Sequence, residues 1–320
     1  MKLIDLPRSC EKQLYCSTVD KIVTRLSTQP YVDAIYQVGN VRHPGISDID
    51  LLVVVHDDAQ TNDDPLERLS VAERYLFTHS CFVVPLSLAP DLARNVLLSG
   101  YRRLHGTVWR WTADPVTARA LEVQTALEFL AKNLVDLYVQ LTYRVLKVRV
   151  FLQHLKGVKV DLALLGIEGG RLAAVLEHAT ELIDNWFGRR DLEQQVAETA
   201  IELLPLLRDA LADATTRETL FAPSGDAIPF ARNISLTRGA AIELMHRGVR
   251  LPPLPRLEAR RRFNAHHRVN RFRFSLPMTP AQAGSYHASR FEFLSRAKAF
   301  TAQRLPAYSA PIPPLFYRAL

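Results

Sequence analysis

Hydrophobic residues in the first third of the chain follow first a helical spacing and then the spacing of strands. The apolar side chains between Glu11 and Ser27 recur every three or four positions, which predicts a helix that Gln29-Pro30 ends. Val32 to Val38 is typical of a strand, and Leu51 to Val55 is apolar and β-branched enough to be a buried strand. A loop that begins with Gly39 joins the two strands. The predicted order is therefore helix, strand, glycine loop, strand.

Shorter elements follow up to residue 114. Asp64-Pro65-Leu66-Glu67 combines an acidic N-cap, a proline at the first helical position and a glutamate at the third, which predicts a helix to about Phe77. Ser80 to Leu88 is typical of a third strand, in which Pro85 favours an edge position or a bulge. The region is completed by a short helix and an extended segment, Asp91 to Leu98 and Arg102 to Trp111.

Helical periodicity dominates from Asp114-Pro115 onward. Apolar residues at steps of three and four form one buried stripe between Val116 and Leu155, which predicts one long helix or two helices, ended by Gly157. Two further helices, Arg171 to Phe187 and Asp191 to Ala212, predict a helical bundle. The later predicted elements are a linker, a short helix and a last helix: Pro223 to Pro229, Thr237 to Arg247, and Thr279 to about Leu305.

Together these patterns predict an α/β fold with a small mixed sheet in residues 1–114, an α-helical bundle in residues 115–220 and a basic C-terminal segment in residues 221–320. No apolar run of membrane-spanning length lacks charges, and the first residues show no signal-peptide core. The three cysteines, Cys10, Cys16 and Cys81, are odd in number and lack metal-binding spacing. We therefore expect a cytoplasmic protein with free thiols.

The net charge of +7 is concentrated at one end of the chain. Residues 221–320 hold 16 lysines and arginines against 4 acidic residues, whereas the two preceding regions are each slightly acidic. Such asymmetry favours contact between the basic segment and something anionic. A triphosphate, a nucleic acid, an anionic lipid surface and the acidic regions of the same chain all fit this description.

Arginine alternates with phenylalanine in the stretch from Arg250 to Phe274. Guanidinium groups pair with phosphates and aromatic rings stack on bases, so this stretch is a candidate anion-binding segment. An exposed basic loop in an arginine-rich protein is the alternative interpretation. The candidate anion-binding residues are Arg260, Arg261, Arg262, Arg268, Arg271 and Arg273.

Asp48 and Asp50 open the second predicted strand. Side chains two residues apart on a strand point to the same face, so two negative charges meet at the end of a hydrophobic sheet. Such a pair is costly unless a cation lies beside it, and hard carboxylate oxygens suit Mg²⁺. Both residues are therefore candidate Mg²⁺ ligands.

The glycine at the strand end, the loop and the Asp-x-Asp opening resemble the signature of the polymerase-β-type nucleotidyltransferase superfamily. The resemblance covers about the first third of the chain, and the matching residues are Gly39, Asn40, Ser47, Asp48 and Asp50. It implies that the phosphates of a nucleotide bind near Gly39 and Asn40. It also implies that Asp48 and Asp50 hold catalytic Mg²⁺ and that a third acid comes from a later strand. Asn40 stands where serine is usual, and its amide can also donate to a phosphate.

The resemblance is incomplete at the third predicted strand. A member of the superfamily would have an acid near Ser80, Cys81 or Phe82, and this chain has none there. Three alternatives remain open: the aspartates bind a single Mg²⁺, a base comes from the helical region, or the site is catalytically silent. Glu122 and Glu128 are the candidate bases.

The function that the resemblance implies is transfer of a nucleoside monophosphate from an NTP to an acceptor hydroxyl with Mg²⁺. The acceptor would be a small molecule such as an aminoglycoside or a sugar, a protein side chain, or an RNA end. Arg42 and Ser47 of the loop are further candidate nucleotide contacts, although Arg42 also fits a solvated loop. The alternative is a catalytically degenerate protein on the same scaffold that binds nucleotide, nucleic acid or a partner protein, as an antitoxin-like protein would.

Overall fold

The computed structural model describes residues 1–98, 100–189, 191–223, 227–231, 234–237, 241–244, 273–311 and 315, with the backbone alone for 227–231, 234–237, 241–244 and 273. The chain divides into two compact units. The first, called the sheet unit below, comprises Arg8–Leu121 and Ser289–Ile312. The second, the helical unit, comprises Met1–Pro7, Glu122–Ala288 and Pro313–Leu320. Neither unit is one continuous stretch, so they do not coincide with the three predicted regions.

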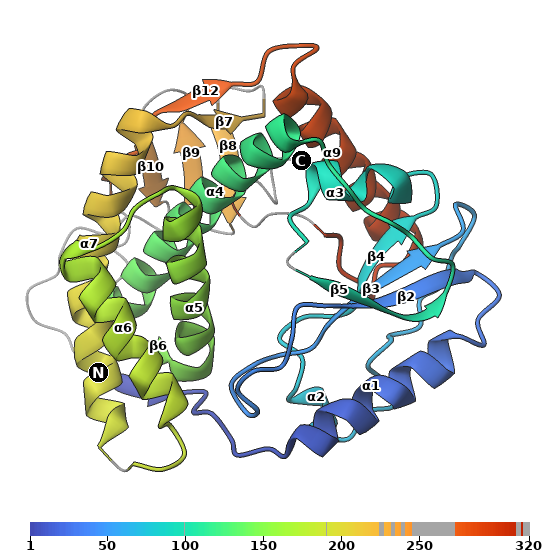
Figure 1. Ribbon diagram of the computed structural model, residues 1–320, viewed down its shortest axis with the longest axis horizontal. Helices are drawn as coiled ribbons and strands as arrows, with labels where there is room; N and C mark the ends of the chain where they lie inside the picture. The colour runs from blue at the N-terminus through green and yellow to red at the C-terminus, as the bar shows by residue number, and fades with distance from the viewer. Residues whose placement is uncertain are drawn as a thin grey trace, which may run out of the picture. The chain divides into compact units, whose positions relative to one another are not determined.

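A four-stranded mixed sheet forms the centre of the sheet unit (Figure 1), in the order β4-β3-β2-β5. The central strand β2 runs antiparallel to β3 and to β5, whereas β4 runs parallel to β3. The strand bounds are Val32–Val38 for β2, Asp50–Val55 for β3, Phe82–Pro85 for β4 and Tyr101–Gly106 for β5. The predicted small mixed sheet is thus present, and the predicted bounds of its first strand are confirmed.

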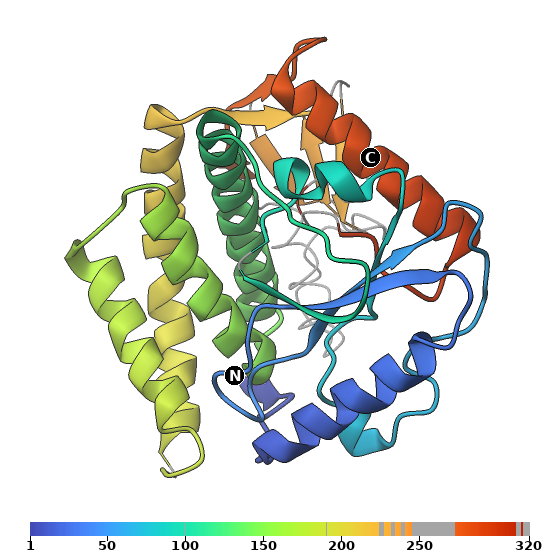
Figure 2. The same ribbon diagram turned by 45° about the vertical axis from the view of Figure 1, so that its right-hand side comes forward.

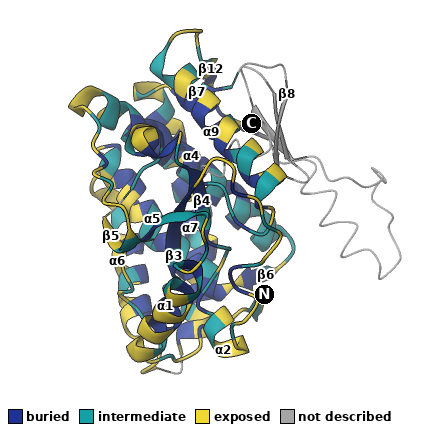
Figure 3. Ribbon diagram, turned by 90° about the vertical axis from the view of Figure 1, so that its right-hand side faces the viewer, coloured by how far each residue is buried: buried dark blue, intermediate teal, exposed yellow. Residues whose placement is uncertain are grey.

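Helices cover both faces of this sheet. Helix α1, Lys12–Leu26, packs its apolar side against Ile35, Leu51 and Val53. On the other face lie the short helix α3, Leu92–Asn95, which follows the 3₁₀ turn Ala89–Asp91, and the long helix α9, Tyr286–Arg304 (Figures 1 and 2). Because both faces are covered, all five residues from Leu51 to Val55 are buried (Figure 3), which explains why these five positions of β3 are all apolar.

The C-terminal part of the chain completes the sheet unit. Arg290 of α9 is fully buried and donates a hydrogen bond to the carbonyl of Asn95 at 3.2 Å. Beyond α9, Ser309 pairs with the outer side of β4: its carbonyl accepts from the amide of Val83 and its amide donates to the carbonyl of Cys81, both at 2.9 Å. This pairing covers the edge of the sheet. The edge position that Pro85 favoured is confirmed, although β4 already ends at this residue.

The helical unit contains a bundle of helices, drawn in green and yellow in Figure 2. Its helices are α4, α5, α6 and α7, with bounds Pro115–Thr142, Val148–Leu164, Gly170–Asp184 and Leu192–Arg217. The start of α4 is as predicted, because the carboxylate of Asp114 accepts from the amide of Thr117 at 3.0 Å. Between α4 and α5, the strand β6, Val145–Lys147, pairs in parallel with β1, Lys2–Ile4.

Two small sheets are also described in the helical unit. In one, β7 pairs in parallel with β12; the bounds are Leu220–Ala222 and Met278–Pro280. The other is a four-stranded antiparallel sheet in the order β11-β10-β9-β8, with bounds Arg273–Ser275, Ala241–Leu244, Ile234–Thr237 and Ala227–Ala231. In the described part of the chain, no helix has both the length and the apolar composition of a membrane span.

The predicted helix from Asp64 to Phe77 is wrong. The Asp64 carboxylate accepts from the amide of Leu66 at 2.8 Å, which closes a local turn in place of a helix. The helix in this region, α2, comprises only Val71–Arg74 and begins at a capping box between Ser70 and Glu73. The sequence held two N-cap signals, and the second one starts the helix.

Other predicted boundaries also differ from the structure. The predicted end at Gly157 is wrong, because Gly157 lies inside α5, which continues to Leu164. Of the two predicted alternatives for this stretch, two helices are present, and they part near Arg144, whose φ of 55° is left-handed. The last helix begins at Tyr286 because Met278–Pro280 is a strand. Strands also replace part of the predicted linker Pro223 to Pro229 and of the predicted helix Thr237 to Arg247. The third strand, the short helix after it and the final strand are each shorter than predicted: Phe82–Pro85, Leu92–Asn95 and Tyr101–Gly106.

Candidate metal centre

The loop between β2 and β3 begins with a backbone shape that favours glycine. Gly39 has a φ of 68°, in the left-handed region, and its amide donates to the carbonyl of Gly100 at 2.9 Å. This hydrogen bond joins the start of the loop to the chain entering β5. The backbone turn therefore requires Gly39 whatever else the residue does.

Two tyrosine hydroxyls hold the far end of the loop. Tyr15 of α1 donates to the carbonyl of Ser47 at 2.7 Å and accepts from the amide of Gly45 at 2.9 Å. Tyr75 donates to the carbonyl of Gly45 at 2.6 Å. The Ser47 hydroxyl accepts from the amide of His43 at 3.1 Å, which closes the loop on itself. These bonds fix the backbone immediately before the two aspartates.

The sequence predicts that both aspartates lie on the strand, but in the structure only one of them does. Asp50 is the first residue of β3, whereas Asp48 lies in the loop two residues earlier. The segment before β4 runs beside this stretch: the amide of Ile49 donates to the carbonyl of Leu76 at 2.9 Å. The hydroxyl of Thr78 donates to Oδ2 of Asp48, which orients that carboxylate. The two acids and the segment 76–80 thus form one local structure.

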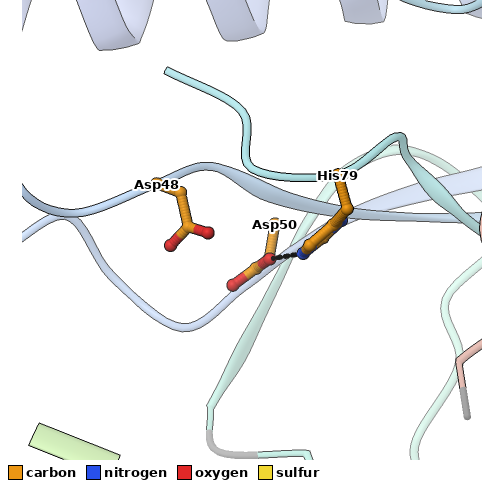
Figure 4. A group of neighbouring side chains, drawn as sticks. All are labelled: Asp48, Asp50 and His79. Carbon is orange, nitrogen blue, oxygen red and sulfur yellow. Dashed lines mark ion pairs between the residues drawn. The ribbon is translucent and has the colours of Figure 1, made fainter. Parts of the chain in front are cut away.

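His79 completes a group of three side chains that could hold a metal. One ligand atom from each of Asp48, Asp50 and His79 lies within 4.8 Å of the other two. Figure 4 shows the three side chains gathered beside one another, with Nε2 of His79 paired to Oδ1 of Asp50 at 2.9 Å. Among the described residues, this is the one group of three or more acidic, histidine or cysteine side chains with such geometry. An imidazole therefore joins the pair where the resemblance had implied a third carboxylate.

Two contacts fix the imidazole ring. Nδ1 of His79 lies 2.8 Å from the carbonyl oxygen of Ser80, and because a carbonyl only accepts, Nδ1 must carry the hydrogen. The ring also lies against Phe82, with 4.4 Å between ring centroids. Nε2 is therefore the nitrogen that faces Asp50, in the arrangement common to metal-binding histidines.

In the absence of a cation, burial and the charges within this group shift the pKa values of Asp48 and His79. Burial, followed by the nearby charge of Asp50, raises the pKa of Asp48, although Thr78 and His79 partly offset this rise. Burial alone would lower the pKa of His79, but its hydrogen bond to Asp50 and the charge of that carboxylate outweigh burial, so the pKa is raised. A protonated His79 therefore balances part of the negative charge, which a divalent cation would balance more fully.

The centre is open to solvent. The side chains of Asp50 and His79 are 34% and 33% exposed, so solvent and small ions have access to both. Two carboxylates and one imidazole form a donor set that fits a divalent metal ion. The arrangement could therefore hold a cation at the start of β3.

The other predicted residues have varied surroundings. Asn40 and Arg42 are exposed in the loop, and neither belongs to the Asp48, Asp50 and His79 group. Of the two candidate bases, Glu128 is fully buried in the helical unit, where Gln124 donates to it at 2.7 Å, and Glu122 is half-buried in the same unit. Of the predicted anion-binding arginines, Arg273 has only its backbone described, and the remaining five lie outside the described residues: Arg260, Arg261, Arg262, Arg268 and Arg271.

The sequence did not indicate His79 as a ligand, because the resemblance implies an acid on the strand itself. The strand was predicted to begin at Ser80, whereas β4 begins at Phe82, so the ligand lies in the turn that precedes it. The available signal was the polar triplet Thr78-His79-Ser80 directly before a buried strand.

No protein-family model matches the sequence, and no curated protein is significantly similar to it. We therefore infer the function from the residues of this chain.

Proposed function

We propose that this protein is a nucleotidyltransferase-like enzyme that transfers a nucleoside monophosphate from an NTP to an acceptor hydroxyl. The observation that carries the proposal is the group of Asp48, Asp50 and His79, whose ligand atoms lie within 4.8 Å of one another at the start of β3. The glycine turn at Gly39 supports it, because that turn ends the neighbouring strand β2. These are the features on which the resemblance to the polymerase-β-type superfamily rests.

In this proposal, different residues of the chain bind the metal ion and the phosphates. Asp48, oriented by Thr78, would hold the divalent ion together with Asp50 and His79. When bound, that ion neutralises charge that develops on the phosphoryl oxygens as pyrophosphate leaves. The backbone at Gly39 and the amide of Asn40 lie in the loop that would bind the phosphates, and Ser47 keeps this loop closed. Mg²⁺ is the proposed ion on the nucleotide itself, because NTP phosphates carry it.

A second candidate function is nucleotide binding without turnover. The observation that favours it is that, in the described residues, no third carboxylate joins the metal-binding group. In a two-metal mechanism such an acid helps to hold the catalytic ion and to remove the proton from the attacking hydroxyl. A protein without this base would bind a nucleotide, a nucleic acid or a partner protein on a silent scaffold.

Incubation with each labelled NTP in Mg²⁺ or Mn²⁺ separates the two candidates. Without an added acceptor, self-labelling or slow hydrolysis reports turnover, and acceptor pools of small molecules, RNA and protein are then added. We expect pyrophosphate release that falls by about 100-fold or more in Asp50→Asn, because a charged ligand that stabilises the transition state is lost. Asp58→Asn is the matched control, since Asp58 is exposed just after the same strand.

Three outcomes of this assay lead to different conclusions. Release that disappears in Asp50→Asn and persists in Asp58→Asn supports transfer. Nucleotide binding in a filter or calorimetric assay, with no release by the wild-type chain for any NTP, acceptor pool or metal, supports the silent scaffold. Release that Asp50→Asn leaves unchanged overturns the assignment of the site.

A further inference from the structure

The donor set of the centre differs from one built for magnesium. Mg²⁺ favours oxygen ligands, keeps much of its water and is usually held by one or two carboxylates. Imidazole nitrogen instead raises the affinity of a site for the first-row transition metals, which bind more tightly from Mn²⁺ towards Co²⁺ and beyond. In this chain an imidazole nitrogen lies 2.9 Å from a carboxylate oxygen of the Asp-x-Asp pair.

We propose that Asp48, Asp50 and His79 hold a first-row transition-metal ion in preference to Mg²⁺, and that Nε2 of His79 confers this preference. The inference rests on the metal-binding half of the proposed function, and it assigns a different ion to the protein from the one carried by the nucleotide. The chemical class is a divalent ion of the series from Mn²⁺ to Zn²⁺.

The surroundings of His79 indicate that this residue is a metal ligand and that its position beside Asp50 is not a chance surface contact. Its Nδ1 is committed to the carbonyl of Ser80 at 2.8 Å, which leaves Nε2 as the atom available to a metal. The ring is held against Phe82, so its direction is set before any ion arrives. The adjacent residue Thr78 orients Asp48 through its hydroxyl. One short segment therefore supplies a ligand for the ion and an orienting hydrogen bond for a second ligand.

Segment 76–80 is also tied to the aspartates by its backbone. The amide of Ile49, between the two acids, donates to the carbonyl of Leu76 at 2.9 Å. The distance between His79 and the carboxylates is therefore set by main-chain pairing as well as by the ion pair. A preorganised site of this kind discriminates between ions by the type of ligand atom, because the ligands need not move to meet the metal.

Calorimetric titration of the full chain with Mg²⁺, Mn²⁺ and Co²⁺, in the absence of nucleotide, tests the inference. We expect affinity to rise in that order, with Co²⁺ bound at least about tenfold more tightly than Mg²⁺. His79→Asp supplies an oxygen in place of the nitrogen and should reduce this ratio by about tenfold. His56→Asp, the same change at an exposed residue just after β3, should leave it unchanged.

A spectroscopic readout on the wild-type chain keeps the test independent of folding in the variant. With Co²⁺ bound, the Nδ1–H of a coordinated His79 gives a paramagnetically shifted, exchangeable proton resonance, which its hydrogen bond to Ser80 protects from exchange. The resonance should be present in His56→Asp and absent in His79→Gln.

Equal affinity for Mg²⁺ and Co²⁺, or Co²⁺ binding without this resonance, overturns the inference and leaves His79 as an ion-pair partner of Asp50 alone. Because no nucleotide is present, the outcome is separate from that of the transfer assay. If the chain prefers Co²⁺ but releases no pyrophosphate, the metal inference stands and the proposed transfer is overturned. If the chain turns over NTP but shows no metal preference, the proposed transfer stands and the metal inference is overturned.

Discussion

The carbonyl of Ser80 determines which nitrogen of the His79 ring points towards the aspartates. It accepts from Nδ1 of His79 and so directs Nε2 towards Asp50. A side chain that is one-third exposed would otherwise sample several directions and contribute little as a ligand. At the scale of one residue, then, a backbone acceptor converts an ordinary histidine into a directed donor.

Buried ionisable groups in the helical unit give a second consequence at this scale. Asp161 of α5 is 6% exposed, and its Oδ2 has no hydrogen-bond partner in the described structure. Burial raises its pKa to about 8, partly offset by Lys132. Burial also lowers the pKa of His154 to about 3, assisted by Lys132, whose Nζ lies 2.9 Å from Nε2 of the ring. The folded state therefore favours the neutral forms of both residues.

Asp161→Asn should remove a loss of stability that develops as the pH rises from about 4 to about 8. Because the folded pKa of Asp161 is raised, its contribution is complete below the ordinary pKa near 4 and is lost as the pH rises to about 8. His154 acts oppositely: its contribution is present above pH 6.5 and is lost as the pH falls towards 3. In urea denaturation, the variant should gain on the wild type as the pH rises from 5 to 8, by about 1–3 kcal/mol at the top.

The control for this prediction is Asp209→Asn on α7, whose side chain is 69% exposed. Its difference from the wild type should stay small at every pH. A stability difference for Asp161→Asn that does not change with pH would show that the carboxyl does not titrate in this range.

At the scale of elements, the pairing of β5 with β2 depends on one close backbone approach. Gly106 ends β5 with a φ of 77°, and a Cβ added there would lie 1.8 Å from the carbonyl oxygen of Asp33. The register between β2 and β5 also shifts nearby, between Ile35 and Tyr36. Only glycine allows the two backbones to come this close.

Gly106→Ala should therefore destabilise the sheet unit by about 3 kcal/mol or more, since left-handed strain and overpacking add. Gly100→Ala is a suitable comparison, because Gly100 has a φ of 73° but open space where the Cβ would lie. It should cost only about 1–2 kcal/mol, from the backbone conformation alone. Chemical denaturation measures both, and equal costs would contradict the close approach.

The elements that could be predicted from the sequence are those with strong local signals. Val32–Val38 has the composition of a buried strand, and α4 begins at Pro115 with Asp114 as its cap, as expected. The start of α2 could not be chosen locally, because Asp64 and Ser70 both resemble caps. The long-range ion pair of Lys21 with Glu73, at 3.0 Å, supports the second choice and is invisible in the sequence.

The candidate site was predictable to a similar extent. Asp48 and Asp50 could be proposed because their spacing and the apolar run after them are local features. His79 could not, because its approach to Asp50 depends on how the segment before β4 pairs beside Ile49. A ligand contributed by a turn distant in sequence has no fixed spacing by which to find it.

At the scale of the whole molecule, consecutive regions of sequence do not correspond to compact units. Ser289–Ile312 belongs to the sheet unit, whereas the preceding residues back to Glu122 belong to the helical unit. Pairing between segments far apart in sequence produces this division, as with Ser309 on the edge of β4. The net charge of +7 is therefore not a property of one domain, although the excess of basic residues within 221–320 is larger than that of the whole chain.

The central claim is that Asp48, Asp50 and His79 form one metal centre. Crystals of the full chain grown with Co²⁺, with anomalous scattering measured at the cobalt edge, test it most directly. We expect a strong peak bonded to a carboxylate oxygen of each aspartate and to Nε2 of His79, at about 2.0–2.2 Å. A peak held by the aspartates with His79 turned away, or no peak at this position, would contradict it.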